Sequence, residues 1–196
     1  AYSVGWIPFL ILLGMSIMGL SYNLRLIPKR FAYDKYSRLR DIPGSKTVLI
    51  AMAWGIVTSI LPQLGESGNI HLNTAIIFLW SLGLVFVRTA FFDILDMQGD
   101  RIVGNDTFAI LLGEKRSMRL LKNMLIALIA ALILLSSFHL ISYLGFVLIS
   151  CPIFFLLLLS AYERGVLLPS IKLEFLVETT FILAGVVAFL WSVFDL

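Results

Sequence analysis

The sequence predicts an all-α protein: a single transmembrane domain over residues 1–196, built as a polytopic bundle of six membrane-spanning helices. The first observation behind this is composition, because 60% of the residues are hydrophobic and only 14% are charged. Such values are typical of polytopic membrane proteins and exclude an ordinary soluble domain. The second is the presence of six apolar segments close to the length of about 20 residues that a helix needs to cross the hydrocarbon core. The third is the gathering of basic residues in the connections between these segments.

The six expected helices lie near residues 4–21, 47–64, 73–95, 118–137, 141–160 and 175–194. Small residues recur in the second helix, around Gly55, and in the last, around Gly185, and small residues permit close helix approach. Cys151 is the single cysteine of the chain, so it cannot form an internal disulfide. We interpret it as a small core residue.

Among the connections, only alternate ones contain basic residues. Seven lie between residues 22 and 46, and others lie in the connections 96–117 and 161–174, whereas 62–72 and 138–140 contain none. The positive-inside rule then places the basic connections in the cytoplasm. We therefore expect an integral protein of a prokaryotic cytoplasmic membrane, with Ala1 on the outer side.

The predicted topology leads to an expectation about what precedes Ala1. A cytoplasmic N-terminus would require an odd number of helices before Ala1, and the sequence has no initiator methionine. We expect that an N-terminal portion precedes this sequence. A processed or split chain is the alternative.

The stretch 88–107 carries the strongest functional signal, because four of the twelve carboxylates fall within residues 93–106. Asp93, Asp96 and Asp100 are spaced i, i+3, i+7, so they would share one face of a continuous helix. Carboxylates crowded at the end of a membrane helix repel one another unless a cation neutralises them. Mg2+, which keeps several waters and binds substrate phosphates, is the usual partner. We predict that these three aspartates are catalytic and bind Mg2+; the alternative is that they only mark a solvated helix end.

Cations lie near the aspartates. Lys46 stands at the head of the second helix, and Arg101 directly follows Asp100. Arg88 lies inside the third apolar segment, where it either pairs with a carboxylate to hold the bundle or binds a diphosphate oxygen. The basic loop 22–46 either contacts anionic lipid head groups or binds a phosphorylated substrate. A nucleic-acid partner is excluded, because a short loop in so apolar a chain offers no docking module.

The pattern Asp93-x-x-Asp96-x-x-Gly99-Asp100-Arg101-x-x-Gly104-x-Asp106-Thr107 resembles the second aspartate-rich motif of the UbiA-type intramembrane prenyltransferases. Residues 42–46, Ile-Pro-Gly-Ser-Lys, resemble the stretch before the fifth helix of that family. Tyr22 resembles the tyrosine that ends its fourth helix. The resemblance covers most of the chain.

The resemblance implies a nine-helix bundle of which this chain holds the last six. It implies a prenyl diphosphate bound through Mg2+ and transfer of the isoprenoid group to a lipophilic acceptor, often aromatic or a quinone precursor. Four residues would contact the substrate: Tyr22, Lys46, Arg88 and Arg101. The isoprenoid tail would lie against Phe91, Phe92 and Trp54.

The sequence departs from the family at one motif. The first aspartate-rich motif is absent, and residues 1–24 contain no carboxylate. The chain therefore holds half of the metal site, and a missing N-terminal half or a partner subunit would supply the rest. One alternative is a non-catalytic or partner-dependent membrane subunit that binds prenyl diphosphate. Another is a small ion-coupled transporter, which would show ion flux and no affinity for diphosphate.

Overall fold

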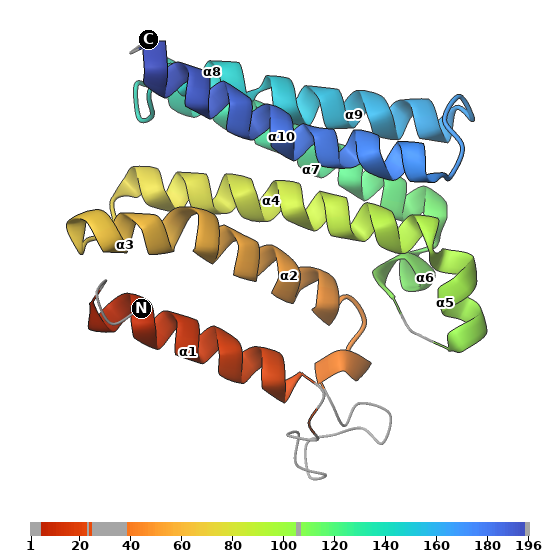
Figure 1. Ribbon diagram of the computed structural model, residues 1–196. Coiled ribbons are helices and arrows are strands. Elements are labelled where there is room, and N and C mark those ends of the chain that lie inside the picture. The colour runs from red at the N-terminus through yellow and green to blue at the C-terminus, as the bar shows by residue number, and fades with distance from the viewer. Residues whose placement is uncertain (1–4, 23, 25–38, 105–106, 195–196) are drawn as a thin grey trace. The chain divides into compact units, whose positions relative to one another are not determined.

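The computed structural model of the protein describes residues 5–22, 24, 39–104 and 107–194. The described residues form helices and no strand, which confirms the all-α prediction. Contacts divide the chain into two compact units, Ala1–Gly113 and Glu114–Leu196, whose helices can be followed in Figure 1. Most of the basic loop 22–46 and Asp106 of the aspartate motif lie outside the described residues.

Five helical segments are long and apolar enough to cross a membrane: Ser45–Ser67, Leu72–Leu95, Glu114–Ser137, Leu144–Glu163 and Ile171–Phe194. Each agrees to within four residues at either end with a span predicted from the sequence. The expected first span is shorter, because α1 (Trp6–Ser21) has 16 residues. At a rise of 1.5 Å per residue it is about 24 Å long, against a hydrocarbon core of roughly 30 Å. The chain is a polytopic helical membrane protein.

The first unit is built around two antiparallel spans. Its elements after α1 are η2 (Leu39–Asp41), α2 (Ser45–Gly55), the π-helix η3 (Ile56–Ile60), α3 (Leu61–Ser67), α4 (Leu72–Leu95), α5 (Met97–Val103) and α6 (Phe108–Leu112). α2, η3 and α3 follow one another without a gap and form one span, and α4 returns beside it (Figure 1). The start of α2 therefore lies beside the end of α4.

Close packing joins these two spans near their middle. A Cβ built on Gly55 would lie 2.9 Å from Cε2 of Phe78 on α4, which is closer than side chains approach one another. The absence of a side chain at Gly55 therefore lets the two helices meet, as the small residues of this segment predicted.

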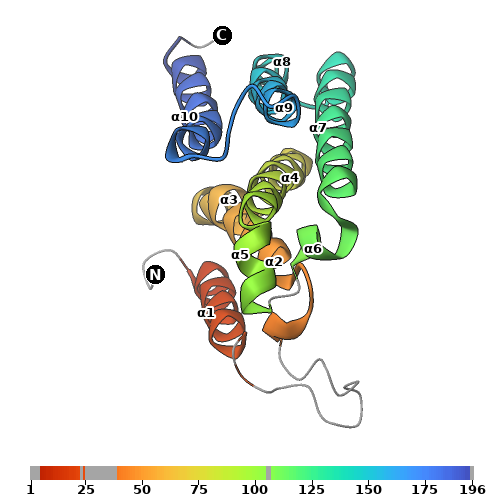
Figure 2. The same cartoon turned by 90° about the vertical axis from the view of Figure 1, so that its right-hand side faces the viewer.

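The second unit consists of three spans. They are α7 (Glu114–Ser137), the pair α8 (Leu144–Leu148) and α9 (Ser150–Glu163), and α10 (Ile171–Phe194). Figure 2 shows α8 and α9 between α7 and α10, and both neighbours contact them. Cys151 is fully buried, which confirms its predicted place in the core. Gly185 is exposed and a Cβ there would meet nothing within 4 Å, so the close approach expected in the last helix is not confirmed.

Candidate functional site

The end of α4 meets the start of α2 through one buried hydrogen bond. Thr47 Oγ1 donates to Asp93 Oδ2 over 2.7 Å. Thr47 is fully buried and Asp93 is 6% exposed. A buried carboxylate needs a partner of this kind, because burial removes the water that would otherwise solvate it. The bond uses one carboxylate oxygen and leaves the lone pairs of the other for a further ligand.

The aspartates do not lie on one continuous helix, so the expectation of a single helical face over them is wrong. α4 ends at Leu95, and Asp96 takes φ −87° and ψ 2° before α5 begins. The Asp96 N–H donates to the Phe92 carbonyl oxygen, and the Asp96 carbonyl accepts from the Asp100 N–H. The break gives Asp96 and Asp100 a new helix N-terminus, where the helix dipole favours negative charge. Asp96 and Asp100 still lie within electrostatic range of Asp93.

These carboxylates do not form a closed metal cage. Within the described part of the chain, no three His, Cys, Asp or Glu side chains are grouped so that they could hold a metal ion by themselves. Mg2+ does not require such a cage, because it commonly binds through one or two carboxylates, several waters and substrate phosphates. One or two of these carboxylates, together with waters and a diphosphate, would supply the oxygen ligands that Mg2+ takes.

The three predicted cations have different surroundings. Lys46 is exposed at the start of α2 and lies within electrostatic range of Asp93. Arg101 is exposed on α5. Arg88 is half-buried, and its guanidinium carbon lies 4.8 Å from the centre of the Phe92 ring. This cation–π contact gives Arg88 an aromatic neighbour one helical turn away. The structure thus brings Lys46 to the aspartates.

The aromatic residues expected to contact the substrate differ in their position and in how far their side chains are exposed. Tyr22 ends α1, and its backbone N–H donates to the Gly19 carbonyl oxygen. Among the residues that the structure describes, no hydrogen bond joins Tyr22 to the aspartates. Phe91 is fully buried, whereas Phe92 is half-buried and Trp54 is exposed. In this conformation the side chains of Trp54 and Phe92 are accessible to an isoprenoid chain, whereas that of Phe91 is not.

The segment after the aspartates folds back onto the junction of α2 and α4. Gly104 ends α5 with φ +77°, a conformation that glycine adopts without steric cost. Phe108 of α6 then packs edge-to-face on Phe86 of α4, with ring centres 6.0 Å apart. The Cβ of Phe108 lies 3.6 Å from the position that a Cβ on Gly44 would take. Gly104 therefore allows the turn that brings α6 against α4 and the start of α2.

Thr47 is the residue of this site that sequence reasoning missed. The signal that could have found it is the near-equal length of the two antiparallel spans, 23 and 24 residues, on either side of the connection 68–71. In that register residue 47 stands opposite residue 92, next to Asp93. A buried threonine facing an aspartate is then the expected hydrogen-bond donor.

The chain matches the family model described as the UbiA prenyltransferase family over residues 1–168. Comparison with curated proteins gave no match, and neither did comparison with solved structures.

Proposed function

The chain belongs to the UbiA prenyltransferase family, and on that premise we propose that it transfers an isoprenoid group from a prenyl diphosphate to a lipophilic acceptor in the membrane. One observation carries the proposal at the level of residues. Thr47 fixes the buried Asp93, with Asp96, Asp100 and Lys46 within electrostatic range. Grouped carboxylates beside a lysine at the end of a membrane span suit a divalent cation and a diphosphate.

The roles of the residues follow from their chemistry. Mg2+ held by one or two of the carboxylates of Asp93, Asp96 and Asp100, with waters and the diphosphate itself, would neutralise the charge that develops on the departing diphosphate. The exposed Lys46 and Arg101 would contact diphosphate oxygens and add positive charge where the negative charge develops. Thr47 would hold Asp93 in one rotamer. The apolar helices would exclude water, so that the allylic cation left by ionisation meets the acceptor before it is hydrolysed.

A transfer assay tests this proposal. Membranes that contain the full chain would be incubated with labelled farnesyl diphosphate and a lipid extract of the source membranes, which supplies the acceptor. We expect label in an apolar product, formed with Mg2+ and lost with EDTA. Asp96→Asn should abolish transfer, whereas Glu66→Gln, an exposed carboxylate on α3, should not change it. Wild-type turnover in Asp96→Asn would overturn the assignment.

A second candidate is a membrane subunit that binds prenyl diphosphate without turning it over. The observation that favours it is the lack, among the described residues, of a three-carboxylate group able to hold a metal unaided. Binding that depends on Mg2+, in membranes that show no transfer, would support this candidate. Transfer by the chain would exclude it.

A further inference from the structure

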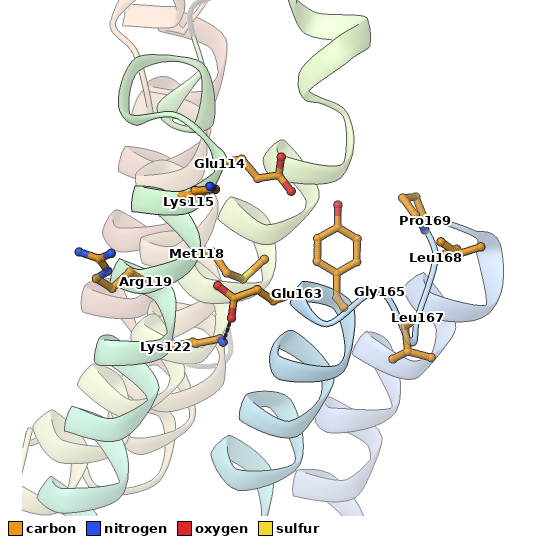
Figure 3. Close-up of a pocket in the computed structure, with 11 residues that line it drawn as sticks. Glu114, Lys115, Met118, Arg119, Lys122, Glu163, Gly165, Leu167, Leu168 and Pro169 are labelled. Atoms are coloured by element: carbon orange, nitrogen blue, oxygen red, sulfur yellow. Dashed lines mark hydrogen bonds and ion pairs between the residues drawn. The ribbon is translucent and has the colours of Figure 1, made fainter.

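A cavity of about 640 Å³ lies within the second unit, at the start of α7. Its other walls come from the end of α9 and from the connection between α9 and α10 (Figure 3). Its volume falls in the usual range for small-molecule sites, which is roughly 300–1,000 Å³. It is formed without any residue of the aspartate motif.

The cavity is lined by more cations than carboxylates. The lining includes the cations Lys115, Arg119 and Lys122 and the carboxylates Glu114 and Glu163. Lys122 and Glu163 form an ion pair that joins α7 to α9 and neutralises both charges. Lys115 and Arg119 are exposed and, in the described part of the chain, have no ion pair. Figure 3 shows Arg119 projecting from α7 away from the Lys122–Glu163 pair. With Glu114 counted, the lining keeps a net charge of +1.

The cavity lies at a polar end of its helices. Residues 114–122 of α7 include four Lys or Arg, whereas residues 123–137 include none. The start of α7 therefore suits the membrane–water interface, where basic residues meet anionic lipid.

An exposed apolar edge lies across the cavity from Arg119 (Figure 3). Leu168 lines the cavity and is 71% exposed, and its neighbours Val166 and Ile171 are 73% and 82% exposed. Large apolar side chains so open to water are costly in an aqueous setting and natural against lipid acyl chains. The site therefore combines an anion-binding side with a lipid-facing side.

From this combination we propose that the cavity binds the phosphodiester head group of an anionic phospholipid. Lys115 and Arg119 contact the phosphate oxygens, and Leu168 with the adjoining connection lies against the acyl chains. Basic pockets between transmembrane helices bind anionic head groups in this way. Free phosphate carries the same negative charge as the head group, but it has no acyl chain to contact the apolar edge around Leu168. The proposal is independent of the prenyl diphosphate site.

Native mass spectrometry of the full chain in detergent tests the proposal, with phosphatidylglycerol and zwitterionic phosphatidylcholine as the two probes. The test variant is Lys115→Gln/Arg119→Gln. The matched control is Arg116→Gln/Lys172→Gln, because both residues are exposed near the same end of the unit, lie outside the cavity lining and carry the same total charge. We expect the test variant to lower the apparent affinity for phosphatidylglycerol by at least about tenfold, and the control to change it by less than about twofold.

Three results would overturn the proposal. Equally tight binding of phosphatidylcholine and phosphatidylglycerol to the wild type would show that the head-group charge is not recognised. Equal losses in the two double variants would show a diffuse basic surface instead of this cavity. Displacement of the lipid by millimolar inorganic phosphate would assign the site to free phosphate.

Discussion

Asp93 is a buried carboxylate near the end of a membrane span, and Thr47 is its hydrogen-bond partner. Asp96, three residues later, is exposed and needs no such partner. The two aspartates therefore differ in what fixes them, although they belong to one motif. Asp93 depends on the packing of α2 against α4, whereas Asp96 is exposed.

Thr47→Val should weaken the site while it keeps the shape of the side chain. The variant removes the hydroxyl and leaves a buried carboxylate oxygen without its donor, which costs roughly 1–3 kcal/mol of stability. We expect a lower melting temperature and a higher Mg2+ concentration for half-maximal transfer. Thermal unfolding and initial transfer rates across an Mg2+ titration measure the two effects.

Two controls separate positioning from general damage. Thr47→Ser keeps the donor and should restore the Mg2+ dependence of the wild type. Thr58→Val makes the same change on the same span, at a hydroxyl that donates only to the Trp54 carbonyl of its own helix, and should have little effect. An unchanged Mg2+ dependence in Thr47→Val would refute the positioning role.

The sequence predicted part of this site. The spacing of Asp93, Asp96 and Asp100 identified the carboxylates, because a charged cluster stands out in an apolar chain. The break at Asp96 was not predictable from spacing, since residues 88–103 are compatible with one unbroken helix. Thr47 was missed because its partner is 46 residues away, and only the antiparallel register of two spans brings them together.

Among the helices of the first unit, α2 and α4 pack most closely where Gly55, the last residue of α2, meets Phe78. We infer that this contact fixes how α2 and α4 are aligned along each other. Because no side chain separates the helices there, their backbones approach closely. The same pair of spans carries Thr47 and Asp93 at its far end. We therefore expect a displacement at Gly55 to reach the candidate site.

Gly55→Leu should force α2 and α4 apart. Overpacking of this kind costs about 1–3 kcal/mol, so we expect a lower melting temperature and weaker binding of prenyl diphosphate. Gly14→Leu is the matched control, because a Cβ at Gly14 of α1 meets nothing within 4 Å. A melting temperature as high in Gly55→Leu as in Gly14→Leu would show that the close approach does not matter.

For the whole molecule, hydropathy was sufficient to predict five spans, since each is long, apolar and bounded by polar or basic residues. It could not predict the cavity of the second unit. The walls of that cavity come from residues 114–122 and 162–169, and only packing of α7 against α9 brings them together. From the sequence, topology alone explained the basic residues that follow Arg101 in the connection 96–117.

The alternation of basic connections also predicts the sidedness of the molecule. Cys151 is fully buried, so a membrane-impermeant maleimide should label the wild-type chain poorly. We expect Arg164→Cys to be labelled from the cytoplasmic side and Asn69→Cys from the outer side. Labelling on the reverse sides would contradict the topology and place the aspartates outside.

The central claim is that the aspartates at the end of α4 bind a prenyl diphosphate with Mg2+. Equilibrium binding of labelled farnesyl diphosphate to the purified full chain tests it most directly, with and without EDTA, in the wild type, Asp96→Asn and Glu66→Gln. The account predicts that EDTA removes binding, that Asp96→Asn weakens it by at least about tenfold, and that Glu66→Gln leaves it unchanged. Binding that survives both EDTA and Asp96→Asn would contradict the account.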